Sequence, residues 1–474
     1  MKLKHSLWIV LALVLLAVIL TGVLPFCIPR SVSQAFADTL SVSQFYGDEP
    51  CVDRVALVET PQEGFDTRIH ILDEATSRID VSYYAMHMGQ STDLFLGALL
   101  DAADRGVQVR ILVDGQFGGL TASHRDYATA MGSHPNISLK LYNTPNPLKP
   151  WTWNGRLHDK YILIDNRLLL LGGRNIGDKY FAPEGCTQVL SYDRDVLVCN
   201  TAFEEETEDS VLFDVRAYMD DLWNGKDVRE PFSKETKQGI QKREALSEAY
   251  RRFRLANESL FDHTRDNYPD WTCEANRVTF LHNDTNIGPK PSSTGYALGQ
   301  LLRSAQQSVT LQSPYVILNR NLKALIQDLG EMDIDATILT NSVAVSPNPM
   351  ACTAYHSSRR AIVNTGVNLW EYQGPDTIHA KSYLIDDRMS VVGSFNLDPR
   401  SDSIDTELML AIDSPDFASR LALVQSGYQS HALPVGRDGR YLPDQALEPV
   451  PLSGVKKAMV WVLSPAVWIL KGLT

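Results

Sequence analysis

One motif of eighteen residues occurs twice in this chain, and this repeat constrains the fold more than any other feature. The first copy, HDKYILIDNRLLLLGGRN, occupies residues 158–175, and the second, HAKSYLIDDRMSVVGSFN, occupies residues 379–396. Both copies follow the pattern H-x-K-x4-D-x6-G-x-x-N, so five positions keep their spacing in two segments that lie 221 residues apart. Such agreement does not arise by chance. It predicts that the chain contains an internal duplication.

The sequence that precedes each copy is repeated as well. LDEATSRIDVSYYAM from Leu72 has a counterpart in LRSAQQSVTLQSPYVI from Leu302, and each is typical of a helix end followed by a strand. RGVQVRILVDG from Arg105 and DIDATILTNS from Asp333 indicate further buried strands. The recurring order of strand, helix, strand and hairpin predicts an α/β fold, with two pseudo-symmetric α/β sandwich halves in one chain.

The length of 474 residues, 44% of them hydrophobic, is sufficient for two such halves. Between them, FEEETEDSVLFDVRAYMDDLW and KREALSEAYRRFRLANESLF have helical spacing of apolar residues and indicate a connecting or capping insertion. The expected division is an N-terminal membrane anchor or signal segment at 1–37, a first half at 45–202, a charged helical connector at 203–265, a second half at 266–440 and a C-terminal tail at 441–474.

The N-terminal segment is long and apolar enough to cross a bilayer as a helix. Residues 6–29 carry no charge, Lys2 and Lys4 precede them, and Arg30 follows. By the positive-inside rule, the chain starts in the cytoplasm and its remainder lies outside, attached to the cell membrane by a single pass. The alternative is a secreted protein released by signal cleavage at AFA, residues 35–37. The length of the apolar segment favours the anchor.

The C-terminal tail allows two interpretations. VKKAMVWVLSPAVWILKGL begins at Val455, and its Trp461, Trp468 and three lysines beside apolar residues suit a membrane interface. The other interpretation is a terminal helix packed on the core. Pro465 predicts a break in any single helix here, because proline lacks the N–H that a helix interior requires.

The β-rich run at the start of each motif predicts a strand, and alternate residues of a strand share a face. His158 and Lys160 therefore project together, and so do His379 and Lys381. A neutral imidazole is a nucleophile that needs no metal, and an ammonium group neutralises the non-bridging oxygens of a phosphate. Each motif is thus predicted to bind and attack a phosphate group.

The rest of each motif predicts a hairpin. Asp165 and Asp386 stand at the expected turns, where turn chemistry alone explains them, although they complete the candidate catalytic set. The glycines after the second strand allow close approach of the backbone to a ligand, and Asn175 and Asn396 bring side-chain amides near the histidines as phosphate-binding groups.

One copy supplies only part of a phosphodiester-cleaving site. The departing alkoxide needs a proton, so a second histidine opposite the first is expected to serve as general acid and then as general base. The duplication meets this need if the two motifs face each other across the interface between the halves. A binding module with an inactive site is disfavoured because both half-sites are complete.

The net charge and the cysteine spacing limit which partners and cofactors are expected. The net charge of −13 supplies no general attraction for a polyanion, so no nucleic acid partner is expected. The six cysteines include no C-x-x-C pair and no zinc spacing, so no metal is expected. Cys186 and Cys199 are the cysteines closest in sequence for a disulfide, but buried free thiols are the simpler interpretation. The sequence does not indicate an oligomeric state.

The paired motifs resemble those of the phospholipase D superfamily. GGRNIGDKYF, ILTNS and GSFNLDPRS further resemble its bacterial cardiolipin synthase branch, and the likeness runs from about Val55 to Ala432. The resemblance implies two α/β halves in one monomer, a covalent phosphohistidine intermediate and no metal or other cofactor.

The resemblance also implies a carboxylate that orients each histidine, and this role maps onto Glu407 and onto Asp195, where the family more commonly has Glu. Ser394 follows the glycine of the second motif, whereas the first motif has Gly173 where the family usually has Ser. The N-terminal motif of such enzymes commonly supplies the nucleophile. His158 is therefore expected to attack, and His379, held by Glu407, is expected to act as acid and base.

Three reactions share this chemistry: phosphatidyl transfer, hydrolytic release of phosphatidic acid, and nuclease cleavage. The apolar anchor, the acidic charge and the Trp/Lys tail favour a phospholipid substrate at a membrane, whereas a nuclease should show a basic groove. The expected activity is synthesis of cardiolipin from phosphatidylglycerol, with phosphatidylethanolamine as a second candidate substrate. Hydrolysis and nuclease activity remain the alternatives.

Overall fold

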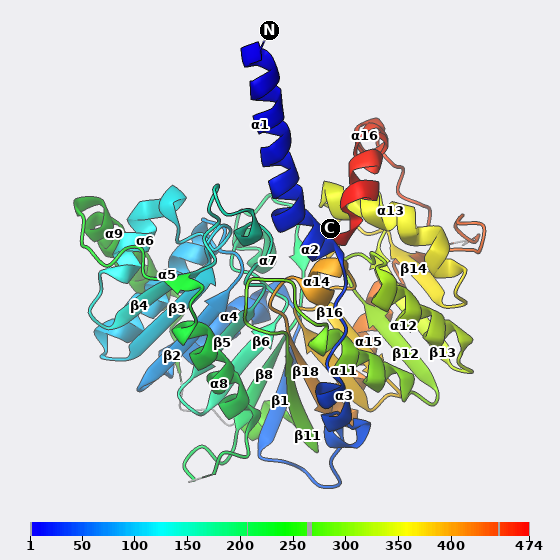
Figure 1. Ribbon diagram of the computed structural model, residues 1–474. Helices are drawn as coiled ribbons and strands as arrows, with labels where there is room; N and C mark the ends of the chain where they lie inside the picture. Colours follow the sequence, from blue (N-terminus) through cyan, green and yellow to red (C-terminus); the bar gives the residue numbers. More distant parts are fainter. Residues whose placement is uncertain (1, 206, 263–267, 444–445, 474) are drawn as a thin grey trace.

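The computed structural model describes residues 2–205, 207–262, 268–443 and 446–473. Two large mixed sheets, one in each half of the chain, meet in the middle of the molecule, and helices cover their outer faces (Figure 1). This arrangement confirms the predicted α/β fold with two pseudo-symmetric halves.

The first sheet has nine strands in the order β10-β1-β8-β6-β5-β2-β3-β4-β9. Its central strands, which include the first motif, are buried along their whole length because both faces of the sheet are covered. The strands are β1 (Asp53–Val58), β2 (Arg78–Tyr83), β3 (Gln108–Asp114), β4 (Ile137–Tyr142), β5 (Lys160–Ile164), β6 (Leu168–Gly172), β8 (Asp195–Asn200), β9 (Val228–Arg229) and β10 (Cys273–Glu274).

The second sheet has eight strands in the order β11-β18-β17-β16-β12-β13-β14-β19, which repeats the first sheet position by position from β1 to β9. In both sheets three neighbouring strands are parallel and the others antiparallel. The strands are β11 (Arg277–His282), β12 (Ser308–Gln312), β13 (Asp335–Asn341), β14 (Asn368–Tyr372), β16 (Lys381–Ile385), β17 (Met389–Gly393), β18 (Leu408–Asp413) and β19 (Ala432–Pro434).

Each sheet buries one face under its own helices and the other face toward its partner half. Separate apolar cores lie beneath the outer helices, and a third core contains residues of β1, β6, β8 and α8 together with residues of β17, β18 and α15. The helices are α4 (Pro61–Asp73), α5 (Gln90–Asp104), α6 (Arg125–Gly132), α7 (Asp178–Phe181), α8 (Val211–Asn224), α9 (Lys237–Ala256), α10 (Tyr268–Trp271), α11 (Ser293–Arg303), α12 (Arg320–Glu331), α13 (Pro349–Val363), α14 (Pro399–Ser403) and α15 (Pro415–Gln429).

The repeated unit is longer than the sequence pattern indicated. The expected connector, residues 203–265, contains α8 and β9, which correspond to α15 and β19 of the second half, and its α9 packs on α5 and α6. The described residues of this segment, 203–205 and 207–262, therefore belong with the first half. Conversely, β10 follows residue 266, where the second half was expected to begin, yet it pairs with β1.

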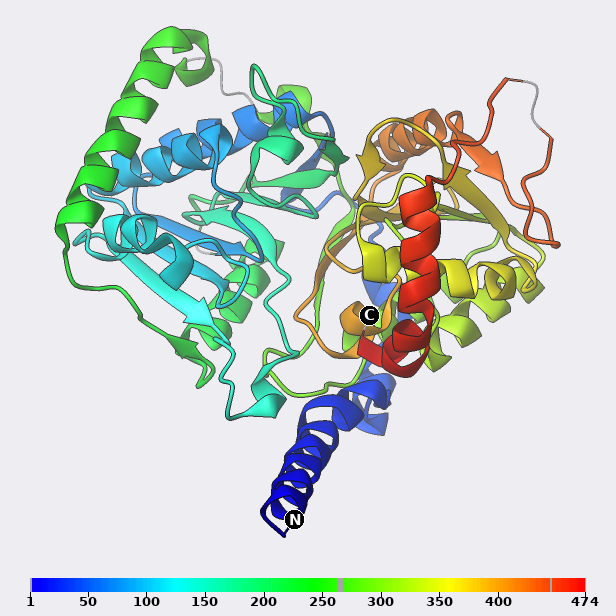
Figure 2. The same cartoon turned by 90° about the horizontal axis from the view of Figure 1, so that it is seen from above.

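The N-terminal helix stands away from the rest of the molecule (Figures 1 and 2). It consists of α1 (Lys2–Val18), a π-helical turn (Ile19–Val23) and α2 (Leu24–Cys27), and α3 (Gln34–Thr39) follows on the surface of the second half. His5–Cys27, with a mean hydropathy of 3.0, is a segment long and apolar enough to cross a membrane. The finding is consistent with the expected membrane anchor.

The C-terminal tail ends in one helix, α16 (Gly454–Leu470), which continues through Pro465. The predicted helix break is therefore wrong. Leu463 and Val467, on either side of the proline, pack against Ala351 and Ala354 of α13. These contacts stabilise the helix and offset the loss of the one backbone hydrogen bond that proline cannot donate.

Candidate active site

The two motifs meet at one cavity of about 910 Å³ between the halves. His158 and His379 each lie two residues before the first residue of a strand, β5 or β16, and both line the cavity. Lys160 and Lys381 are the first residues of these strands and are fully buried. The structure thus brings the two predicted half-sites together.

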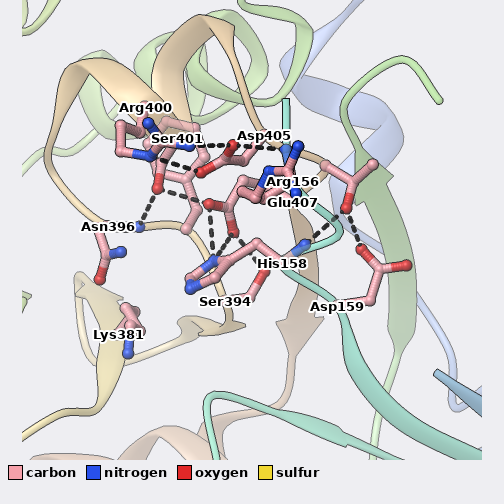
Figure 3. Close-up of polar contacts among 12 residues, drawn as sticks. Arg156, His158, Asp159, Lys381, Ser394, Asn396, Arg400, Ser401, Asp405 and Glu407 are labelled. Atoms are coloured by element: carbon pink, nitrogen blue, oxygen red, sulfur yellow. Dashed lines mark hydrogen bonds and ion pairs between the residues drawn. The ribbon is translucent and has the colours of Figure 1, made fainter. Parts of the chain in front are cut away.

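Each histidine is held by a carboxylate from the other half. Nδ1 of His158 lies 2.9 and 3.0 Å from the two carboxylate oxygens of Glu407 in the second half (Figure 3). Nδ1 of His379 is hydrogen-bonded to Asp193 of the first half. This exchange corrects the expectation that Glu407 holds His379. The short strands β7 (Ser191–Tyr192) and β15 (Thr377–Ile378) pair across the halves beside Asp193 and His379 and make the exchange possible.

Asp195 does not hold a histidine, contrary to the prediction. Its carboxylate lies 2.9 Å from Arg68 and 3.0 Å from Arg174 in a buried ion-pair cluster. The strand register explains the error. Gly172 is paired with Asp195, whereas the equivalent Gly393 is paired with Met409, so the position that corresponds to Glu407 is Asp193.

Sequence reasoning missed Asp193 because the connections differ in length. Asp193 follows Asn175 by eighteen residues, whereas Glu407 follows Asn396 by eleven, so a count from the motif does not reach the equivalent position. The segment YDRD offers two carboxylates at alternate positions, and this was the available signal. Only the pairing of the strands distinguishes them.

The surroundings of the two carboxylates differ. Ser394 and Ser401 donate hydrogen bonds of 2.5 and 2.6 Å to Glu407, which Figure 3 shows beside His158. Gly173 takes the place of Ser394 in the first half, and a Cβ atom there would lie 2.2 Å from Oδ1 of Asp193. The glycine is therefore needed because the Asp193 carboxylate occupies the space of a side chain.

Burial sets the protonation of the histidines. It lowers the pKa of His379 to about 3, with the charge of Lys381 acting in the same direction, and it lowers the pKa of His158 well below the ordinary value. Both rings are then neutral at pH 7. With Nδ1–H directed at the carboxylate, Nε2 of each ring carries the lone pair that can act as nucleophile or base, and Nζ of Lys381 lies 3.4 Å from that nitrogen in His379.

The paired carboxylates and lysines respond to the same environment. Burial acts to raise the pKa of Asp193, but Lys381 and His379 outweigh it and hold that pKa well below the usual range. Burial raises the pKa of Glu407 to about 8 and lowers the pKa of Lys160 to about 7. Asp193 is therefore ionised.

Both motif asparagines line the cavity beside the histidines, as predicted. Nδ2 of Asn175 donates to the hydroxyl of Tyr180 at 3.2 Å. Oδ1 of Asn396 is buried and has no hydrogen-bond partner in the part of the chain that the structure describes. Aromatic rings complete the walls, with Tyr84 edge-on to His158 and Tyr180 edge-on to His379.

Asp165 and Asp386 are remote from the histidines, and their inclusion in the catalytic set is corrected. They occupy the hairpin turns at the far ends of β5 and β16, with φ values of 50°. Each carboxylate accepts hydrogen bonds from three consecutive backbone N–H groups, at residues 76–78 and 306–308. They fix the hairpins to the loops before β2 and β12, because a short carboxylate in a turn can satisfy several N–H groups.

The structure describes all six cysteines as free thiols, and three of them, Cys199, Cys273 and Cys352, are buried. Over the described residues, no group of three or more His, Cys, Asp or Glu side chains has an arrangement suited to a metal ion.

The sequence matches the family described as "Cardiolipin synthase, PLD-like domain" over residues 69–208 and 298–424, which include both motifs and both histidine-holding carboxylates. This chain belongs to the phospholipase D superfamily. Within it, the chain falls in the cardiolipin synthase-like branch of phospholipid transferases, as the sequence motifs predicted.

Named members of this branch are similar over most of their length. Cardiolipin synthase C of Escherichia coli (strain K12) is 26% identical over 410 residues, which cover 79% of this chain and 84% of that protein. A cardiolipin synthase of Staphylococcus aureus (strain Mu50) is 24% identical over 374 residues, or 76% of this chain and 64% of that protein. The structure of phosphatidylserine synthase from Haemophilus influenzae Rd KW20 has the same fold, with a TM-score of 0.63, 16% identity and coverage of 91% and 99%.

Proposed function

We propose that this phospholipase D-superfamily member transfers a phosphatidyl group from phosphatidylglycerol to a second lipid alcohol and so makes cardiolipin. One observation carries the proposal: two histidines, each oriented by a carboxylate from the opposite half, line a single cavity, and each is followed two residues later by a buried motif lysine. The relatives named as cardiolipin synthases and the apolar anchor support a phospholipid as substrate.

In the proposed first step, Nε2 of His158 attacks phosphorus and the bond to the departing glycerol oxygen breaks. Because His379 is neutral in the free site, it takes up a proton from solvent when the anionic phosphodiester binds beside it, and it then donates this proton to that oxygen. The ionised Asp193 stabilises the imidazolium. The phosphatidyl group is then bound to His158 as a phosphohistidine. Lys160 and Lys381 neutralise its non-bridging oxygens, and the amides of Asn175 and Asn396 hydrogen-bond to them.

In the second step, His379 removes a proton from the hydroxyl group of the acceptor lipid. The new oxygen attacks phosphorus, the phosphorus–nitrogen bond breaks, and His158 is regenerated. With two phosphatidylglycerol molecules the products are cardiolipin and glycerol; with phosphatidylethanolamine as donor, ethanolamine leaves instead. Water as acceptor would give phosphatidic acid.

The test is incubation of the full-length protein in phosphatidylglycerol membranes, with and without phosphatidylethanolamine, followed by thin-layer chromatography and mass spectrometry. Cardiolipin is expected. Release of phosphatidic acid without transfer product would establish hydrolysis instead, and cleavage of DNA would establish a nuclease.

The roles of the histidines are tested with phosphate-labelled lipid, acid-quenched turnover and peptide mapping. Label is expected on His158, and His158→Ala should abolish it. His379→Ala should slow breakdown of the intermediate by about two to four orders of magnitude, as loss of general acid–base catalysis does. Label on His379 in the wild-type protein would exchange the two roles.

A further inference from the structure

Two exposed apolar surfaces lie on either side of the base of the N-terminal helix. In both views the base of α1 lies between the loop 146–154 and the end of α16 (Figures 1 and 2). The two surfaces belong to opposite halves of the molecule, and the catalytic function does not account for either.

The first surface contacts the anchor inside its apolar span. The side chain of Asn154 donates a hydrogen bond to the carbonyl of Gly22, and a Cβ atom at Gly22 would lie 2.7 Å from Cβ of Pro150. Gly22 precedes Cys27, the last residue of the span, by five positions. At 1.5 Å per residue, the contact lies about 7 Å inside the end of the apolar helix. A bilayer crossed by that helix therefore reaches the loop.

The side chains on this loop suit such a position. Leu148 is 88% exposed, and Trp151 and Trp153 are 47% and 39% exposed. The indole N–H of Trp153 donates to the carbonyl of Asn146 at 2.8 Å, so its polar atom is satisfied while the ring is presented outward. Tryptophan and leucine with satisfied polar groups are typical of a membrane interface.

The second surface is the outer face of α16. Its inner face packs on α13, whereas Val455, Trp461 and Trp468 are between 79% and 84% exposed. Trp461 and Trp468, seven residues apart, lie on one face of the helix, whereas Val455 is exposed about a third of a turn away. The turn after this helix touches the anchor, because a Cβ atom at Gly472 would lie 2.8 Å from Cα of Cys27.

The local charge of both surfaces also favours contact with a lipid bilayer. Residues 454–473 contain three lysines and no acidic residue, although the whole chain has a net charge of −13. The loop likewise contains Lys149 and no acidic residue between positions 144 and 155. The ammonium group of Lys456 is hydrogen-bonded to the carbonyls of Ala344 and Ser346, but Lys457 is exposed. Exposed basic residues beside exposed tryptophans attract a surface of anionic phospholipids.

We propose that the loop 146–154 and the outer face of α16 insert into the leaflet where the anchor leaves the bilayer, so that the catalytic cavity opens at the level of the lipid head groups. Trp153 lines the rim of the cavity. A phospholipid therefore reaches the histidines from the leaflet without entering bulk water. This route of entry rests on the proposed function, whereas the insertion of the two surfaces does not.

Insertion is tested with the full-length protein in phosphatidylglycerol–phosphatidylcholine vesicles whose acyl chains carry bromine, which quenches tryptophan fluorescence on contact. The four changes Trp151→Phe, Trp153→Phe, Trp461→Phe and Trp468→Phe, made together, should remove most of the quenched emission and leave that of Trp8 in the anchor. Trp271→Phe is the matched control, because Trp271 is as exposed as Trp153 but lies on α10. If the bromine quenches the same amount of emission in the fourfold variant as in the wild-type protein, the four tryptophans do not contact the acyl chains, and the proposal is overturned. A second copy of the chain that covers these four rings would give this result.

Entry from the leaflet is tested by Leu148→Glu. The rate on long-chain lipid in vesicles should fall about tenfold or more, because a charge is costly in the apolar region, while the rate on a water-soluble short-chain phospholipid is retained. Leu423 is 76% exposed on α15, the orange helix that lies away from α1 in Figure 2, so Leu423→Glu should change neither rate. Equal loss on both lipids would refute entry from the leaflet. If the wild-type protein transforms neither lipid, the proposed function fails, and the quenching experiment still decides insertion.

Discussion

At the scale of single residues, the site depends on carboxylates that cross between the halves. His158 and His379 belong to motifs of nearly identical sequence, but their partners are different acids in different surroundings. Glu407 accepts hydrogen bonds from two serines, whereas Asp193 stands beside Gly173 and the charge of Lys381. The two histidines are therefore inequivalent in spite of the repeat, which suits the different roles proposed for them.

Replacement of Asp193 tests its role in positioning. Asp193→Asn should lower the rate by about two to four orders of magnitude, because His379 loses the charge that stabilises its imidazolium. Asp195→Asn should instead lower the melting temperature, because it leaves two buried arginines without their anion. The reverse result, an active Asp193→Asn enzyme and a stable but inactive Asp195→Asn enzyme, would restore the original assignment to Asp195. The measurements are kcat/KM and thermal unfolding.

Gly173 offers a second test at this scale. Gly173→Ala places a methyl group where Oδ1 of Asp193 now lies, so the carboxylate must move away from His379. We expect a lower kcat with little change in KM for the lipid. Ser394→Ala, at the equivalent position, removes a hydrogen bond to Glu407 without a clash and should cost less. A normal kcat in Gly173→Ala would show that the position of Asp193 is not critical.

At the scale of structural elements, each motif hairpin is fixed at both ends. The histidine and asparagine end faces the cavity, and the opposite end is held by Asp165 in one half and Asp386 in the other. The motif thus combines catalytic positions with a structural one. The same hydrogen-bonding pattern at both turns explains why the aspartate keeps its spacing from the histidine.

Asp165→Ala should reduce the free energy of unfolding by about 2–4 kcal/mol, because it removes hydrogen bonds from a partly buried carboxylate to three backbone N–H groups. The rate per folded molecule should change little. Urea denaturation and active-site titration measure the two quantities. A severe loss of kcat in a fully folded variant would return Asp165 to the catalytic set.

The effect of this substitution should depend on pH. Burial acts to raise the pKa of Asp165, but hydrogen bonds from Ser77, Arg78 and Thr76 outweigh it, so the folded pKa lies below the ordinary value of 3.8. The unfolded chain then binds the proton first as pH falls. The stabilisation is complete above about pH 4 and is lost at more acidic pH. The difference in stability between wild type and Asp165→Ala should therefore shrink below pH 4.

At the scale of the whole molecule, duplication and membrane attachment act together. The pseudo-symmetric interface makes one cavity from two motifs, and the anchor and α16 lie on the same side of the molecule as α7 and α14, the helices that follow the motifs (Figure 1). A phospholipid transferase needs this arrangement, because its substrates remain in the bilayer.

Lys2 and Lys4 before the span predict that the catalytic halves lie outside the cytoplasm. Protease added to intact spheroplasts should then digest the chain after Arg30 and leave the N-terminus protected. Protection of the whole chain until the cells are lysed would reverse the orientation. Release of a protein that begins after residue 37 would instead establish signal cleavage.

The sequence by itself determined the features that are local or repeated. The repeat located His158 with Lys160 and His379 with Lys381 as matched pairs and implied two facing α/β halves, although the strands begin at the lysines and leave the histidines just outside them. The tertiary structure decided which carboxylate serves which histidine. These contacts join residues 249 and 186 positions apart, and they depend on strand register and on the packing of the halves, which no local spacing specifies. The tertiary structure also decided that α16 continues through Pro465, because packing on α13 outweighs the tendency of proline to break a helix.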